Sequence, residues 1–125
     1  MIDAKQGIGL LGCGAIGRGL ALAVDRGTVG RAELVALFDQ DSHNAQSLLQ
    51  QLSSSPRVAD SFEDFMAING MALVVEAASQ RAVRQHGAAI VSQGKHLLIM
   101  STGALLDAAL FSELATLTQQ MECRI

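Results

Sequence analysis

Short apolar runs alternate with amphipathic stretches along the whole chain. Runs of this length without polar positions are typical of strands that are buried on both faces of a parallel sheet. Strands are predicted at residues 7–11, 33–39, 57–59, 72–77 and 96–100. Residues 123–125 have the pattern of another strand that is just beginning.

The stretches between these runs have the spacing of helices. Helices are predicted over Ala15–Asp25, 42–52, 61–66, 80–93 and 105–120. Ser42 is the predicted N-cap of the second helix, and Gly94 is the predicted stop of the fourth. Because strands alternate with helices, the connections should be right-handed crossovers within a parallel sheet. The predicted fold class is α/β: a Rossmann-type doubly wound parallel sheet in three α/β/α layers.

The chain of 125 residues has the length of one domain. Half of its residues are hydrophobic and only 17% are charged, so a packed core is expected rather than a disordered tail. The last residues fall where a sixth strand should begin. We therefore expect residues 1–125 to be a nucleotide-binding domain whose C-terminal catalytic domain lies outside this chain.

Composition excludes several classes of partner. The net charge is −3, no stripe of Lys and Arg is visible, and the aromatic residues are four Phe, so nucleic-acid binding is not expected. Arg18 and several glycines interrupt the first apolar stretch, which argues against a signal peptide or a membrane span. Cys13 and Cys123 show no metal-ligand or disulfide spacing, so we expect free thiols, no metal and a cytoplasmic location.

The clearest chemical signal is the segment GCGAIG at residues 12–17, directly between a predicted strand and a predicted helix. In this context G-x-G-x-x-G indicates a dinucleotide site. Gly12 permits a tight turn, Gly14 lets a pyrophosphate approach the backbone, and Gly17 lets the helix pack on the strand. Free N–H groups near Ala15 and Ile16, at the positive end of the helix dipole, favour the diphosphate.

Asp39 ends the second predicted strand, about 20 residues after the last glycine of this segment, where a ribose-binding acid is expected. Its carboxylate can accept hydrogen bonds from the two adenosine ribose hydroxyls and would repel a 2′-phosphate. The sequence therefore favours NAD over NADP. Gln40 and Ser42 could still bind a 2′-phosphate weakly, so NADP stays possible.

Other candidates follow the fourth and fifth strands, whose carboxyl ends should face the same cleft. Ala77, Ala78 and Ser79 are small enough to line the nicotinamide-ribose side, although Ser79 could equally be the N-cap of the next helix. Ser101 and Thr102 could contact the nicotinamide or the substrate, or form a plain turn.

No complete catalytic set is visible. His43 and His86 are predicted to be solvated on helices, and His96 begins a strand. Glu76 is predicted to bind nearby backbone N–H groups and shape its loop rather than to catalyse. Arg81 is predicted to be a surface charge.

Four stretches carry a family resemblance: GLLGCGAIGRGLALAV, ELVALFDQD, LVVEAASQRAVRQHG and GKHLLIMSTGAL. Together they resemble the cofactor-binding half of L-aspartate dehydrogenases along nearly the whole chain. The resemblance implies NAD(P)-dependent oxidation of L-aspartate at its CH–NH₂ group to iminoaspartate, which feeds NAD synthesis, in an enzyme that forms homodimers. It also implies that the catalytic histidine lies in the C-terminal domain, so that this chain alone would be inactive.

The resemblance also implies roles for individual residues. By this resemblance, the pyrophosphate should contact Gly12, Gly14, Ala15, Ile16 and Gly17. The adenosine ribose should bind Asp39, and the nicotinamide side of the cofactor should contact Ala77, Ala78, Ser79, Ser101 and Thr102.

Other readings stay open. Homoserine dehydrogenase and dihydrodipicolinate reductase are similar at lower resolution. A stand-alone module that binds a dinucleotide and senses its redox state would have the same fold, because one fold hosts many functions. A methyltransferase-like nucleotide binder is a third reading, against which the three glycines and the acid argue.

Overall fold

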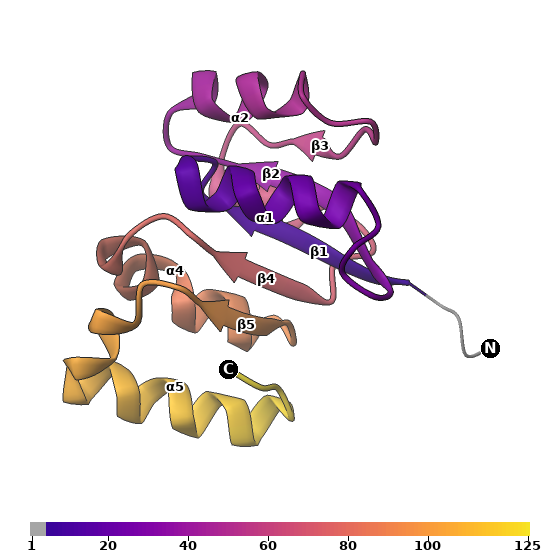
Figure 1. Ribbon diagram of the computed structural model, residues 1–125. Coiled ribbons are helices and arrows are strands. Elements are labelled where there is room, and N and C mark those ends of the chain that lie inside the picture. Colours follow the sequence, from indigo (N-terminus) through magenta and orange to yellow (C-terminus); the bar gives the residue numbers. More distant parts are fainter. Residues whose placement is uncertain (1–4) are drawn as a thin grey trace.

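The computed structural model describes residues 5–125 and contains one parallel sheet (Figure 1). Its strands are β1 (Gln6–Leu11), β2 (Ala32–Phe38), β3 (Arg57–Val58), β4 (Leu73–Glu76) and β5 (His96–Ile99). They lie in the order β3-β2-β1-β4-β5, so the order reverses between β1 and β4. The predicted doubly wound fold is therefore confirmed, and a ligand is expected beyond the carboxyl ends of β1 and β4.

Helices cover both faces of the sheet. They are α1 (Ala15–Asp25), α2 (Ser42–Leu49), α3 (Phe62–Met66), α4 (Gln80–Ser92), the 3₁₀ helix η1 (Thr102–Leu106) and α5 (Ala108–Met121). Helices α1 and α2 pack on one face, and α3, α4 and α5 pack on the other. In Figure 1, α1 lies in front of the strands and α4 lies behind them.

Each face of the sheet has its own hydrophobic core. Val75 packs with the α1 and α2 side, whereas its neighbour Val74 packs with the α3, α4 and α5 side. Successive strand residues point to opposite faces, and here both faces are covered. This arrangement explains why the strands read as unbroken apolar runs.

One predicted N-cap and one predicted helix start were wrong, in each case because an aspartate caps the helix. Asp41 rather than Ser42 is the N-cap of α2, and its side chain accepts a hydrogen bond from the His43 N–H at 3.0 Å. The last helix begins at Ala108 instead of residue 105. Asp107 accepts hydrogen bonds from two N–H groups of its first turn, at 3.0 and 3.1 Å, and so fixes the start of α5.

The predicted strand at residues 123–125 does not form. Instead, the Leu97 N–H donates to the Arg124 carbonyl at 3.0 Å, and the Arg124 N–H donates to Nδ1 of His96 at 3.0 Å. The last residues therefore lie along the outer edge of β5 without a repeating ladder. The chain reverses direction at Glu122, directly after α5, where this residue adopts the left-handed conformation with φ 55°.

Asp25 joins the end of α1 to the segment after α2. Its carboxylate accepts hydrogen bonds from the N–H groups of Ser53 and Ser54, at 2.8 and 2.9 Å, and from the Ser54 hydroxyl at 2.6 Å. These bonds, that of the Ser53 N–H first, hold the pKa of Asp25 below its ordinary value of 3.8.

We expect Asp25→Asn to lower the free energy of unfolding at pH 7. The carboxylate stabilises the fold above the unfolded-state pKa, and this contribution is lost as the pH falls through the lowered folded-state pKa. The difference between the native chain and the variant should therefore shrink in acid. Denaturant titrations in steps from pH 7 to acid measure it, and a difference that stays constant with pH would contradict this role.

Candidate functional site

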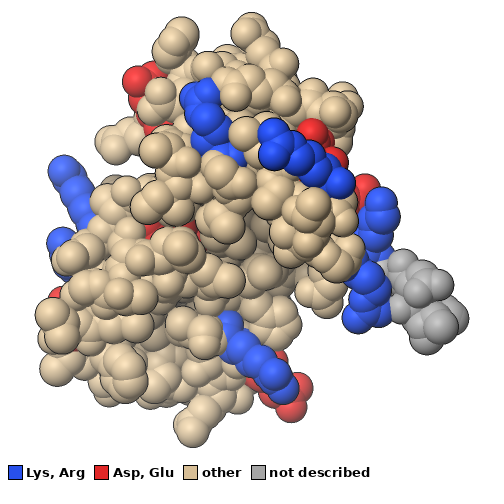
Figure 2. Space-filling model, viewed as in Figure 1, with Lys and Arg blue, Asp and Glu red and all other residues tan. Residues whose placement is uncertain are grey.

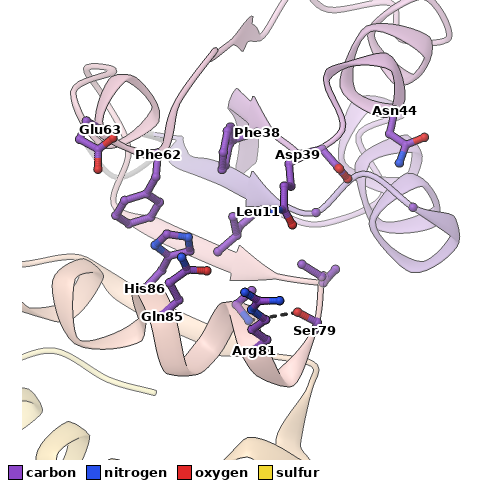
Figure 3. Close-up of a pocket in the computed structure, with 16 residues that line it drawn as sticks. Leu11, Phe38, Asp39, Asn44, Phe62, Glu63, Ser79, Arg81, Gln85 and His86 are labelled. Carbon is purple, nitrogen blue, oxygen red and sulfur yellow. Dashed lines mark hydrogen bonds between the residues drawn. The ribbon is translucent and has the colours of Figure 1, made fainter.

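A cleft of about 630 Å³ lies at the carboxyl edge of the sheet, across β1, β2 and β4 (Figure 3). This is the edge where the reversed strand order predicts a ligand site. The loops after the three strands and the helices α2, α3 and α4 supply its lining. The lining residues are Leu11, Gly12, Gly14, Phe38, Asp39, Gln40, Asn44, Phe62, Glu63, Ala77, Ala78, Ser79, Arg81, Ala82, Gln85 and His86.

The fold itself requires two of the three motif glycines. Gly12 has φ +105°, and a Cβ on it would lie 2.7 Å from the Ala77 carbonyl and from the Ala78 nitrogen. A Cβ on Gly17 would overlap the Gly12 carbonyl oxygen. These two glycines let the loop pass close to the turn after β4 and let α1 start directly against the loop.

Gly14 is different, because nothing in the protein requires a glycine there. It is the N-cap of α1 with φ −80° and ψ −158°, an extended conformation that any residue can adopt. A Cβ on it would have no protein atom within 4 Å, and no side chain caps the helix. The space over Gly14 and the uncapped N-terminus of α1 together suit an anion that touches the backbone.

Asp39 holds the glycine loop in place and also lines the cleft. Its Oδ2 accepts a hydrogen bond from the Cys13 N–H at 2.7 Å, and its Oδ1 accepts one from the Asp41 N–H at 2.8 Å. The carboxylate is half-buried, and each oxygen keeps a lone pair for a further donor. A ribose in the cleft could therefore bind to Asp39 without displacing either backbone bond.

Cys13 lies within the glycine loop but is not a nucleophile. Its side chain is fully buried, and burial, with the Asp39 carboxylate adding to it, raises the pKa of the thiol to about 12. Its Sγ lies 3.9 Å from the Phe38 carbonyl oxygen. A buried thiol with a raised pKa is inert at neutral pH, so Cys13 acts as a small core residue.

Glu76 connects the turns that follow β4 and β5, and its predicted role in loop shape is confirmed. It is 1% exposed. It accepts hydrogen bonds from the N–H groups of Ala78, Ser79, Met100 and Ser101, at 2.8 to 3.2 Å, and from the Ser101 hydroxyl at 2.7 Å. The Ser101 hydroxyl is therefore bound to Glu76.

The cleft brings together six of the predicted site residues and leaves out five. It is lined by Gly12, Gly14, Asp39, Ala77, Ala78 and Ser79, but not by Ala15, Ile16, Gly17, Ser101 or Thr102. Ser79 also caps α4, since its hydroxyl accepts a hydrogen bond from the Ala82 N–H at 3.0 Å. Ile16 is 58% exposed in the first turn of α1, and Thr102 opens η1. The contacts of all eleven with a cofactor stay predictions.

The prediction that His86 is solvated was wrong. His86 is half-buried and stacks on Phe62, with ring centroids 3.9 Å apart and an interplanar angle of 17°. Burial lowers its pKa, and the negative charge of Glu63 partly opposes that shift. Residues 81, 82, 85 and 86 follow a helical spacing that places them on one side of α4. The sequence could therefore have grouped them, but it gave no sign that this side faces the cleft.

Charged side chains cover only a small part of the face shown in Figure 2. Several Lys and Arg side chains lie near one another over its upper right, beside acidic side chains, and most of the rest of this face carries other residues. Within residues 5–125, no group of three or more His, Cys, Asp or Glu side chains could hold a metal ion. None of the helices in this same range is long and apolar enough to cross a bilayer.

Comparisons with known sequences agree with the geometry of the cleft. The family model described as "Homoserine dehydrogenase, NAD binding domain" matches residues 12–125. L-aspartate dehydrogenase of Methanocella arvoryzae is 42% identical over 118 residues, which are 94% of this chain and 42% of that protein. The enzyme of the same name from Nitrosopumilus maritimus is 36% identical over 108 residues, 86% of this chain and 39% of that protein. The chain thus spans about two fifths of the length of these relatives.

Solved structures share the fold. GenD2 from gentamicin A biosynthesis, in complex with NAD, superposes with a TM-score of 0.82 and 18% identity, covering 96% of this chain and 33% of that one. The WlbA dehydrogenase from Bordetella pertussis, in complex with NADH and UDP-GlcNAcA, gives 0.81 and 21%, covering 100% and 36%.

Proposed function

This chain belongs to the family of the homoserine dehydrogenase NAD-binding domain, and from that premise we propose that it is the cofactor half of an NAD-dependent dehydrogenase that acts on an amino acid. The observation that carries the proposal is Gly14. Neither its backbone angles nor any protein neighbour requires a glycine there, and it lies at the uncapped N-terminus of α1. Glycine at this position is explained by a pyrophosphate that approaches the backbone.

The residues of the cleft divide the binding of NAD among them. The N–H groups around Gly14 and the dipole of α1 bind the pyrophosphate. Asp39 accepts hydrogen bonds from the adenosine ribose. The small side chains of Ala77 and Ala78 leave room for the cofactor to extend toward its nicotinamide end. NAD, when bound, supplies the hydride acceptor, and this chain orients it.

The charge of Asp39 should set the choice between NAD and NADP. We expect the native chain to bind NADH more tightly than NADPH, since a 2′-phosphate would lie against the carboxylate. Asp39→Asn should weaken NADH binding by about tenfold or more, because a hydrogen bond to a charged acceptor is lost. The variant should also show a smaller ratio of the NADPH dissociation constant to the NADH dissociation constant. Reduced-nicotinamide fluorescence measures both, since the chain has no Trp or Tyr to interfere.

Asp41→Asn is the matched control for this substitution. Asp41 lies two residues away and caps α2, a role that asparagine also performs. Its NADH and NADPH affinities should equal those of the native chain. A native chain that binds NADPH as tightly as NADH would contradict the assignment of Asp39.

We propose L-aspartate as the substrate of the complete enzyme, on the strength of the names of the relatives. The family description favours a second candidate, L-homoserine. In this proposal residues 1–125 form the cofactor-binding domain. A further domain supplies the catalytic groups and the contacts of a homodimer. His86 is stacked on Phe62, and His96 accepts a backbone hydrogen bond. We therefore assign the role of general base to neither histidine.

An assay with each candidate substrate tests this choice. A protein that joins this chain to a catalytic domain like that of its relatives should reduce NAD with L-aspartate, while this chain alone should not. Turnover with L-homoserine and none with L-aspartate would replace the first candidate by the second. A cytoplasmic location is part of the same proposal, since both cysteines are free thiols, as is usual in reducing compartments.

A further inference from the structure

A second cavity, of about 450 Å³, lies beside β3, the strand at one edge of the sheet (Figure 1). Residues 57–60 line it from the strand, and Asp64, Ala67 and Ile68 line it from α3 and the residues that follow. None of these residues lines the cleft that we assign to NAD. The volume falls within the range of about 300–1,000 Å³ that is usual for small-molecule sites.

The backbone of Val58 offers this cavity one donor and one acceptor. Val58 pairs with Leu37 of β2, and the Ala59 N–H donates to the Leu37 carbonyl at 2.9 Å. In a parallel ladder of this register, Arg57 and Ala59 supply the groups that face β2, so the N–H and C=O of Val58 point away from the sheet. Within residues 5–125, no protein group bonds to either of them. An edge strand with a free N–H and C=O can bind a further molecule through both.

The charged side chains of the cavity follow the same polarity as this backbone. Arg57 precedes Val58 in the strand, on the side of the Val58 N–H, and Asp60 follows it, on the side of the Val58 carbonyl. Asp64 lies in the first turn of α3, shortly after Asp60. In the part of the chain that the structure describes, none of these three side chains has a hydrogen-bond or ion-pair partner. Donors therefore gather at the start of β3, and acceptors gather at its end.

The geometry points to a binding site for a free α-amino acid at the edge of β3. The carboxylate of the zwitterion accepts hydrogen bonds from the Val58 N–H and the Arg57 guanidinium, and its ammonium group donates to the Val58 carbonyl and to Asp60. The amino acid then takes the place of a residue in an added strand, which would bond to the same N–H and C=O. This site lies outside the cleft and does not depend on the proposed function.

The balance of charge in the cavity selects the side chain of the ligand. One guanidinium and two carboxylates line it, so one carboxylate is left over when the zwitterion has bound. A basic side chain can place its cation against Asp64, whereas an acidic side chain would be repelled. The class of ligand is therefore a basic α-amino acid, for which L-lysine is the probe.

Titration of the isotope-labelled chain with L-lysine tests the site, and the amide signal of Val58 in NMR spectra is the readout. This signal should move to a saturating value, because the Val58 N–H gains a charged acceptor. L-aspartate should bind at least about tenfold more weakly, because its second carboxylate would face Asp64. A Val58 signal that does not respond to L-lysine in a saturable way would overturn the proposal.

Two analogues of lysine test the two ends of the zwitterion. Cadaverine lacks the carboxylate, and Nα-acetyl-L-lysine lacks the α-ammonium group. Each should bind at least about tenfold more weakly than L-lysine, because each loses charge-assisted hydrogen bonds to the chain. If cadaverine bound as tightly as L-lysine, the cavity would merely attract cations, and the assignment to an amino acid would be wrong.

Substitutions at the two ends of β3 test the protein side of the same contacts. Arg57→Gln and Asp60→Asn should each weaken L-lysine binding by about tenfold or more. Both residues are exposed, so both variants should fold. Arg84→Gln is the matched control, since Arg84 is exposed on α4 and does not line this cavity. Native affinity for L-lysine in both Arg57→Gln and Asp60→Asn would overturn the assignment.

Discussion

Gly14→Val is expected to weaken NADH binding by at least about 100-fold while the fold persists. The valine side chain would occupy the space over the N-terminus of α1, where no protein atom lies within 4 Å of the built Cβ. A pyrophosphate kept away from the backbone loses two or more charge-assisted hydrogen bonds, each contributing about 1.5–3 kcal/mol. The fold should lose only about 1 kcal/mol, because valine is a poorer N-cap than glycine. Fluorescence titration and denaturant unfolding of the same variant measure the two effects.

Gly12→Ala is the matched comparison, two residues away in the same loop. Its methyl group would lie 2.7 Å from the backbone of Ala77 and Ala78, at a φ of +105°. Strain of this kind and overpacking together cost about 3 kcal/mol. We expect Gly12→Ala to unfold more easily and Gly14→Val to stay folded without binding. A folded Gly14→Val chain with native affinity would remove the observation on which the proposed function depends.

Glu76→Gln should lower the free energy of unfolding by about 3 kcal/mol, although it keeps the shape of the side chain. Five donors point at this buried carboxylate, four of them backbone N–H groups. An amide offers only one acceptor oxygen and places its own N–H₂ group among those donors. Buried donors that lose a charged partner cost about 1–3 kcal/mol each, partly relieved by local adjustment.

Denaturant unfolding at neutral pH measures this effect. Glu113→Gln is a suitable control, because Glu113 is exposed on α5 and should change stability by no more than about 0.5 kcal/mol. NADH binding should also weaken in Glu76→Gln, since the turn that Glu76 holds carries Ala78 and Ser79, which line the cleft. Native stability in Glu76→Gln would show that the turns after β4 and β5 are held by other interactions.

The sequence was informative wherever the structure depends on local pattern. The apolar run at residues 33–39 predicted a strand ending in an acid, and the structure has Ala32–Phe38 followed by Asp39. The glycine loop was recognisable because a tight strand-to-helix turn demands specific residues at fixed spacing. The cofactor contacts of these residues stay predictions, although six of the eleven candidates line one cleft.

The sequence was uninformative where long-range contacts or competing local signals decide the outcome. The stacking of His86 on Phe62 depends on how α3 and α4 pack across the sheet, which no local pattern encodes. The last helix was predicted three residues too early, because Leu105 and Leu106 continue the apolar spacing. The helix nevertheless begins at Ala108, because the Asp107 side chain caps its first turn.

The bond from the Cys13 N–H to Asp39 has a consequence for anyone who wishes to convert this domain to NADP. Cys13 and Asp39 lie 26 positions apart in the sequence. If Asp39 binds the adenosine ribose, as we propose, then cofactor choice and loop geometry depend on the same carboxylate. A serine or alanine at position 39 would admit a 2′-phosphate but would also release the backbone that shapes the turn. A successful redesign would therefore need two changes together: a basic group for the phosphate and a replacement acceptor for the Cys13 N–H.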